Sequence, residues 1–408
     1  MTEEITESTP MNGKSFLGYD YKALLLIGGC AGAWFVGYLV NGIAPIFMQT
    51  LGSTLAISES AAGYLISIEF AGAGLATLFV GAQVDRLSKR SVALAGCLLA
   101  VAANVGSMFI DHYGSLLAIR LLAGIGTGSA VVGGAAAVAR YREPERMYGV
   151  VNVLLAISFS ASVVIVSNVL GVFGKPGVFG FVAVAYAAMI PLIFLLPTDI
   201  NLSGEKQERH KLPVVGLGVT FVAGYVIAMI GQNAGWVFAV AIGESSGFNL
   251  EQIGKIIGIS AISGVAGAML SASIGTRFGR AIPAAAGVSA LGLTWGTMCL
   301  VPSSTMFPVL IIVNSISFYF CVSFLVGVAA KLDEWGRWAS VTAGSTLFGS
   351  IIGPAVGGIL VQYGGINVLG WSILCSTGIS LTLILFVVIL LAGKEARQAN
   401  TATTPDPR

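Results

Sequence analysis

The sequence predicts an all-α membrane protein in which twelve transmembrane helices form two related six-helix bundles. Hydrophobic residues make up 56% of the 408 residues and charged residues only 10%, whereas a soluble domain carries roughly 25% charged residues. Apolar runs of about 20 residues, the length that crosses a bilayer, recur along the whole chain. This composition excludes a soluble enzyme and a disordered protein, and the net charge of +2 excludes a nucleic-acid binder.

The apolar runs between polar breaks predict where the spans lie. The expected spans are 24–48, 61–84, 91–110, 114–139, 148–172, 177–196, 214–242, 252–274, 281–300, 307–330, 338–361 and 367–393. The polar segments then divide the chain into an N-terminal tail (1–23), a first bundle (24–196), a linker (197–213), a second bundle (214–393) and a C-terminal tail (394–408).

The basic residues predict the orientation of the chain. If the N-terminus is inside, all but three of the 21 Lys and Arg fall in inside segments, the exceptions being Lys175, Lys255 and Arg120. Cytoplasmic loops carry an excess of Lys and Arg. We therefore expect both tails to be cytoplasmic and the protein to be a multi-pass component of a bacterial inner membrane.

The two halves match each other at one constant offset, which indicates a duplicated six-helix unit. The matched pairs include Gly63 and Gly254, Arg86 and Arg277, Arg146 and Arg337, and Asn41 and Gln232. Two parallel repeats related by an axis along the membrane normal are the architecture of rocking transporters.

The loop between the second and third spans carries a recognisable motif. Gly81-Ala-Gln-Val-Asp85-Arg86-Leu-Ser-Lys89-Arg90 resembles the signature loop Gly-x-x-x-Asp-Arg-x-x-Arg-Arg of the major facilitator superfamily. The second copy of this loop keeps Arg277 and Arg280 but has Thr276 in place of the acid. The fourth span, with Arg120, Gly124, Gly126 and Gly128, is similar to the Arg-x-x-x-Gly-x-Gly motif of the same superfamily.

The resemblance implies the superfamily fold and a conformational role for the loop. It implies that Asp85 faces the start of the eleventh span across the seam between the halves, where a carboxylate near a helix N-terminus is favoured. The alternative is that the bases only anchor the loop at the anionic leaflet. The residues assigned to gating are Gly81, Asp85, Arg86, Lys89, Arg90, Arg277 and Arg280.

Two ionisable residues lie within the expected spans, Glu69 in the second and Arg120 in the fourth. At 1.5 Å per residue they lie roughly 12 Å and 9 Å from the outer ends of two helices that run in the same direction. Because an isolated charge in hydrocarbon costs several kcal/mol, we expect them to pair and to face a shared water-accessible cleft. Glu69 would then carry a coupling proton, and Arg120 would adjust the affinity of Glu69 for that proton. The alternatives are a structural ion pair, a Glu69 side chain that reaches outward to the interface, and direct contact with substrate.

The resemblance also implies that the first, fourth, seventh and tenth spans line a central cavity. The polar and aromatic candidates are Trp34, Tyr38, Asn41, Gln232, Asn233, Trp236, Asn314 and Phe318, with Tyr319 beside them. Ligand pockets combine apolar walls with a few polar groups. The alternatives are hydrogen bonds between helices for the amides and anchoring at the interface for the aromatic residues.

The eleventh span contains a glycine and proline pattern that permits close packing and a kink. Its residues are Gly349, Gly353, Pro354, Gly357 and Gly358. Drug/proton antiporters of the superfamily carry this pattern in the fifth span, so we interpret the copy here as a packing and hinge element. Gly124, Gly126 and Gly128 are assigned to packing as well.

Together these features predict a secondary transporter and not an enzyme. We expect a monomer that moves a small organic solute across the bilayer by proton symport, with an anion favoured because one cation is buried. The alternatives are a multidrug/proton antiporter and a non-transporting receptor on the same fold. The sequence contains no Gly-x-x-x-x-Gly-Lys-Ser/Thr loop for ATP, and its five Cys and two His form no metal or disulfide pattern. No cofactor is expected, and the proton gradient is the expected driving force.

Overall fold

The computed structural model of the chain describes residues 21–138, 144–198, 215–275, 277–279, 281–332 and 337–402. Residues 1–20 of the expected N-terminal tail, residues 403–408 of the expected C-terminal tail, most of the expected linker and Arg280 lie outside these ranges. The helices of the first half are α1 (Tyr21–Gly42), α2 (Ala44–Leu55), α3 (Glu59–Phe79), the 3₁₀ turn η1 (Gly81–Arg86), α4 (Lys89–Phe109), α5 (Tyr113–Val138) and α6 (Pro144–Ile193). Those of the second half are α7 (Val215–Val237), α8 (Ala239–Ser245), α9 (Leu250–Ile274), α10 (Ala281–Leu300), α11 (Met306–Ala329) and α12 (Arg337–Ala402).

The long helices α6 and α12 each turn back on themselves at a glycine with positive φ. The turns lie at Gly174 (φ 57°) and Gly365 (φ 70°), a backbone region that glycine adopts without strain. Among the described residues, 11 helical stretches are long and apolar enough to cross a membrane, and the last of them, Arg337–Leu391, has 55 residues. A straight helix of that size would measure about 80 Å against ~30 Å of hydrocarbon. Since Gly365 splits it, the described residues make twelve crossings, and the predicted fold class is confirmed.

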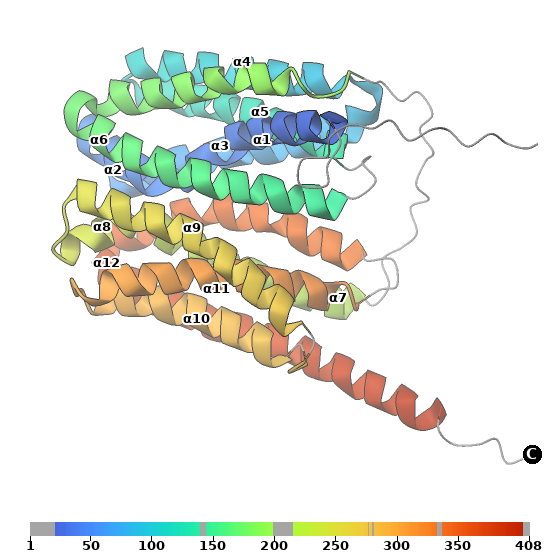
Figure 1. The fold of residues 1–408 in the computed structure, drawn as a ribbon. Helices are drawn as coiled ribbons and strands as arrows, with labels where there is room; N and C mark the ends of the chain where they lie inside the picture. The colour runs from blue at the N-terminus through green and yellow to red at the C-terminus, as the bar shows by residue number, and fades with distance from the viewer. Residues whose placement is uncertain are drawn as a thin grey trace, which may run out of the picture.

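Figure 1 shows the two halves as separate groups of helices. Helices α1 to α6, in blue and green, lie above α7 to α12, in yellow to red. Within each half the helices run roughly along one common direction, as the repeat predicts. The bounds of the two bundles and of the linker remain a prediction.

Several helices begin where the sequence supplies a capping side chain. Ser58 accepts a hydrogen bond from the backbone of Ala61 at the start of α3, and Ser88 does the same for Ser91 at the start of α4. Asn249 and Gln252 form a reciprocal capping box at the start of α9. These bonds satisfy N–H groups that the first helical turn leaves without a partner.

The first and seventh spans differ from the prediction, because each is interrupted before its end. The expected span 24–48 breaks at Ile43 into α1 and α2, and the expected span 214–242 breaks at Phe238 into α7 and α8. Pro45 occupies the first turn of α2. This position suits proline, because a backbone N–H in the first turn would have no partner within the helix. No comparable residue marks the break at Phe238.

The two ends of the molecule differ. One end, called the basic end here, holds Arg86, Arg90 and Arg277, and the other holds α2 and α8 and is called the α2–α8 end. Near the α2–α8 end the halves touch where α3 packs against α12 and α6 against α9. A Cβ added at Gly63 would overlap the carbonyl oxygen of Pro354, so only a glycine permits this approach of α3 to α12.

Candidate functional site

A cavity of about 320 Å³ lies between the two halves. All eight residues expected to line a cavity do so, and so does Tyr319. They come from three helices, namely Trp34, Tyr38 and Asn41 from α1, Gln232, Asn233 and Trp236 from α7, and Asn314 and Phe318 from α11. The structure therefore brings these residues together, and their role in binding remains a prediction.

The expectation that the fourth span lines the cavity is wrong, because no described residue of α5 is among the lining residues. The glycines of α5 instead let this helix pack closely against α3 and α4 of its own half. A Cβ at Gly124 would overlap the backbone of Glu69 on α3, and a Cβ at Gly126 would crowd the backbone of Gly96 on α4. The expected packing role of these glycines thus places α5 inside the first half and away from the cavity.

Sequence reasoning missed the lining residues contributed by three other helices. They include Asn152 and Phe159 on α6, Ile257 and Ala261 on α9, and Thr346 and Ser350 on α12. Asn152 carried a usable signal, because an amide within an otherwise apolar run costs energy in lipid. The remaining residues are of types that also pack between helices, so nothing distinguished them in the sequence.

One wall of the cavity is a fixed network of amide groups. An indole N–H can only donate, so the bond from Trp295 Nε1 to Gln232 Oε1 at 2.9 Å sets which way the Gln232 amide faces. Gln232 Nε2 then donates to Asn314 Oδ1 at 3.0 Å, and Asn314 Nδ2 donates to Thr294 Oγ1 at 2.8 Å. This network holds Gln232 and Asn314 rigidly at the edge of the cavity.

The first half contributes amides whose side chains no described residue engages. The side chains of Asn41 and Asn152 line the cavity and form no side-chain hydrogen bond within the described part of the chain. The backbone carbonyl of Asn41 is engaged, since it accepts a hydrogen bond from Trp236 Nε1 at 2.8 Å and so links the halves. The cavity thus offers two free amides from the first half and a fixed amide network from the second.

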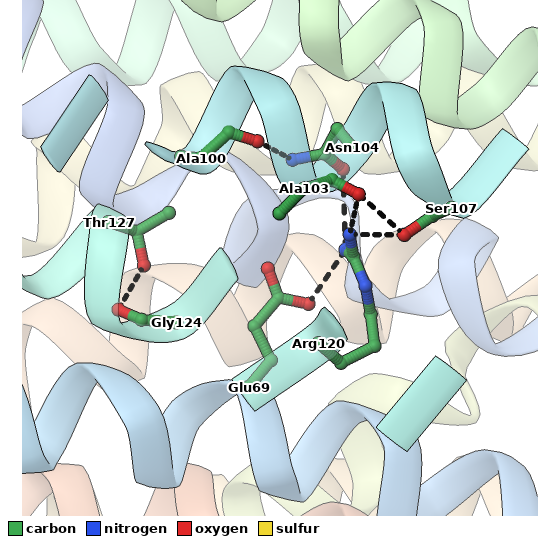
Figure 2. Close-up of polar contacts among 8 residues, drawn as sticks. All are labelled: Glu69, Ala100, Ala103, Asn104, Ser107, Arg120, Gly124 and Thr127. Carbon is green, nitrogen blue, oxygen red and sulfur yellow. Dashed lines mark hydrogen bonds and ion pairs between the residues drawn. The ribbon is translucent and has the colours of Figure 1, made fainter. Parts of the chain in front are cut away.

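Glu69 and Arg120 form the ion pair expected from their matched depths, as Figure 2 shows. Arg120 Nη1 lies 3.3 Å from Glu69 Oε2, and the two residues are 0% and 2% exposed respectively. The expectation that they face a water-accessible cleft is wrong in this conformation, because neither lines the cavity. The pair lies inside the first half, where Gly124 lets α5 approach α3 closely.

Groups of α4 and α6 supply the rest of the environment of Arg120, most of them visible in Figure 2. The guanidinium donates to Asn104 Oδ1 at 3.3 Å, to the Ala103 carbonyl at 3.2 Å and to Ser107 Oγ at 2.7 Å, and it lies 4.9 Å from the centre of the Phe179 ring. A buried charge requires such compensation. Three buried atoms in this cluster still have no hydrogen-bond partner among the described residues, namely Glu69 Oε1, Arg120 Nε and the Tyr186 hydroxyl.

The residues assigned to gating lie at the basic end, where the structure describes them only in part. Gly81 to Arg86 form η1, with Arg86 exposed, and Arg277 lies in an exposed turn. Arg90 joins α4 to the segment that follows α6 through a 2.7 Å bond from Nε to the Leu196 carbonyl, and Lys89 is buried. The side chain of Asp85 and all of Arg280 lie outside the described residues, so the expected contact of Asp85 with the eleventh span remains a prediction.

The glycine pattern of α12 forms two packing faces. Gly349, Gly353 and Gly357 lie against α7 of the same half, where added Cβ atoms would meet Met229, Asn233 and Ala234. Gly358 lies against the backbone of Glu59 on α3 of the other half. Helix α12 therefore packs against α7 of its own half through one face and against α3 of the first half through the adjacent face.

Comparison with known proteins identifies the family. A sequence model of the Major Facilitator Superfamily matches residues 29–330. The chain belongs to this superfamily, which is a family of transporters and not of enzymes, and it is an integral multi-pass membrane protein.

Two curated relatives match parts of the chain. The niacin transporter NiaP of Acinetobacter baylyi is 30% identical over 112 residues, which is 28% of this chain and 25% of that protein. The uncharacterized MFS-type transporter YbcL of Bacillus subtilis is 28% identical over 207 residues, 47% of this chain and 51% of that protein. The chain thus matches a quarter and about half of the lengths of these relatives.

Solved structures share the whole fold. The nucleoside transporter NupG superposes with a TM-score of 0.71 at 15% identity, covering 91% of this chain and 99% of that one. The D-xylose–proton symporter superposes with a TM-score of 0.70 at 14% identity, covering 90% and 96%. At these identities the likeness shows the fold alone.

Proposed function

We propose that the protein is a secondary active transporter that moves a small organic solute by alternating access, driven by proton symport. The cavity between two repeat-related halves supports this function, since a rocking motion of the halves would expose it to each side in turn. The names of similar proteins agree, because niacin, nucleosides and D-xylose are all small organic solutes.

The structure corresponds, in this proposal, to the state open to the cytoplasm. The described hydrogen bonds between the halves lie toward the α2–α8 end, and they include Ser60 N to Gln362 Oε1 at 3.3 Å and Gln49 Nε2 to Glu244 Oε1 at 3.3 Å. The excess of Lys and Arg supports a cytoplasmic position for the basic end. Closure at the α2–α8 end therefore seals the cavity from the outside.

Glu69 is the proposed proton site, with Arg120 as its partner. Arg120 occupies only Oε2, and Oε1 has no hydrogen-bond partner among the described residues, so Oε1 is the atom that would accept the proton. Protonation would remove the ion pair and leave Arg120 as a buried cation, which the first half would have to accommodate by moving.

One observation carries this proposal: Glu69 of the buried pair lies on α3, the helix that contacts α12 of the other half. Glu69 follows Ser67 by two residues on α3, and Ser67 Oγ accepts a hydrogen bond from the backbone N–H of Ala355 on α12. A change in the charge of Glu69 would therefore act on α3 next to its contact with the other half. The purely structural ion pair is the alternative that the experiment below must separate.

The expectation of an anionic solute rested on Arg120 as a buried cation, and the structure removes that basis. Arg120 does not line the cavity and is engaged by Glu69, Ser107 and other groups. The glycine pattern that drug/proton antiporters carry in the fifth span lies here in α12 and forms packing faces, so it does not favour antiport, and we propose symport.

Transport into proteoliposomes tests the proposal. Wild type, Glu69→Gln and Glu251→Gln would be compared for accumulation of labelled nicotinamide, uracil and D-xylose under an imposed pH gradient, and the solute that wild type accumulates is the one used for the comparison. Glu251 is the matched control, because its ion pair with Lys255 is exposed. We expect gradient-driven accumulation by wild type and the control, and only exchange without accumulation by Glu69→Gln. Equal accumulation by all three would contradict the role of Glu69.

A further inference from the structure

We propose that the cavity binds an uncharged, flat heteroaromatic solute whose edge carries hydrogen-bond donors and acceptors. This inference rests on the proposed transport function for its purpose, but the binding it describes needs no gradient and no proton. Three properties of the lining residues carry it: their lack of charge, their aromatic surfaces and which of their amide groups already have hydrogen-bond partners.

The first property is the absence of charge. No Lys, Arg, His, Asp or Glu of the described residues lines the cavity. An ionised group moved from water into such surroundings loses its hydration without gaining a counter-charge. The described walls therefore select against a carboxylate, a phosphate or an ammonium group.

The second property is aromatic surface on both halves. Trp34 and Phe159 belong to the first half, and Trp236, Phe318 and Tyr319 to the second. Trp34 is held by stacking on Tyr148, with ring centres 5.1 Å apart and planes within 15°. Tyr319 lies directly over Gly264, where a Cβ would overlap the ring. Rings fixed in this way offer flat faces at little entropic cost and stack well on another π-system.

The third property separates a ring from a sugar. The amides of Gln232 and Asn314 already satisfy each other together with Trp295 and Thr294. Asn41 and Asn152 are the lining amides with no side-chain partner in the described chain. A polyol brings several hydroxyls, and each buried hydroxyl left without a partner weakens binding. Two free amides instead match the few donors and acceptors on the edge of a heteroaromatic ring.

The size of the cavity agrees with a small ring system. Its volume of about 320 Å³ is at the lower end of the range of roughly 300–1,000 Å³ for small-molecule sites. One ring or two fused rings would fit within it without displacing the fixed network.

Equilibrium binding to the purified full chain in nanodiscs tests this assignment. Nicotinamide, uracil and adenine are the probes that fit. Nicotinate has the ring of nicotinamide with a carboxylate, cyclohexanecarboxamide has its amide without a flat ring, and D-xylose is an uncharged polyol. We expect at least one of the three rings to bind, and each comparison compound to bind at least about tenfold more weakly than that ring.

Variants locate the binding in the cavity. Asn152→Leu and Asn41→Leu each remove one free amide and should raise the Kd of the ring about fivefold, the effect of one lost hydrogen bond. Asn168→Leu is the matched control, since Asn168 lies on the same helix α6 as Asn152 and only bonds the Val164 carbonyl. Thermal midpoints of all variants establish that each is folded, and Asn41→Leu replaces Asn152→Leu if the latter fails to fold.

Three outcomes would overturn the assignment: tighter binding of nicotinate or D-xylose than of any ring, no binding of any ring at millimolar concentration, or unchanged binding of the ring in both cavity variants. Failure of the transport proposal would look different. In that case the ring would bind as described, and proteoliposomes would show no gradient-driven accumulation of it.

Discussion

Ser67 on α3 accepts a hydrogen bond from the backbone N–H of Ala355 on α12, with 3.0 Å between Oγ and N. The bond joins the two halves beside Pro354, whose missing N–H interrupts the regular bonding of α12 at that point. Ser67 also lies two residues before Glu69 on α3, and Glu69 is paired with Arg120 inside the first half. The same helix thus carries the buried charge and a contact that closes the cavity.

A larger side chain at Gly63 should keep the α2–α8 end open. Gly63→Leu would force α3 away from the Pro354 carbonyl, and Gly327→Leu is the control because an added Cβ there meets nothing within 4 Å. The measurement is labelling of Asn41→Cys by an impermeant maleimide added from outside, with the exposed Cys375 replaced by serine. We expect labelling several times faster with Gly63→Leu than with the control. Identical rates would show that this contact does not close the cavity.

A methyl group at Gly124 should destabilise the first half. Its Cβ would overlap the backbone of Glu69, whereas a Cβ at Gly149 meets nothing within 4 Å. Overpacking costs about 1–3 kcal/mol, so Gly124→Ala should unfold at a lower temperature than Gly149→Ala. Thermal unfolding in detergent checks this prediction, and equal midpoints would contradict the close packing of α3 on α5.

The buried ion pair should show strong coupling in a double-mutant cycle. Arg120→Met leaves the Glu69 carboxylate buried without its partner, and removing one member of a buried pair costs about 3–5 kcal/mol. Adding Glu69→Gln removes that charge and should restore part of the stability. The free energies of unfolding of the two single variants and the double variant give the coupling. Additive losses would mean that the two side chains do not interact in the folded protein.

The sequence was sufficient for the crossings and for the ion pair. Glycine, polar breaks and basic loops mark the ends of the spans, and the turn at Gly365 lies between the expected spans 338–361 and 367–393. Glu69 and Arg120 were expected to meet because charges at one depth in lipid have few alternatives. Asn41 and Gln232, matched by the repeat, both line the cavity.

The side of the helix on which each residue lies was harder to predict. A transmembrane helix is apolar on all faces, so no periodicity distinguishes its lipid face from its protein face. For this reason the sequence did not show that Arg120 faces α4, where Asn104 and Ser107 bind it, and not the cavity. The breaks at Ile43 and Phe238 were missed because the apolar runs continue through them.

Proton movement accompanying solute entry tests the central claim most directly. Proteoliposomes would trap a pH indicator, and the solute that wild type accumulates would be added without an imposed gradient. We predict that the lumen acidifies as solute enters through wild type and through Glu251→Gln, and that solute exchange through Glu69→Gln carries no protons. Acidification by Glu69→Gln equal to that of wild type would contradict the assignment of Glu69 as the proton carrier.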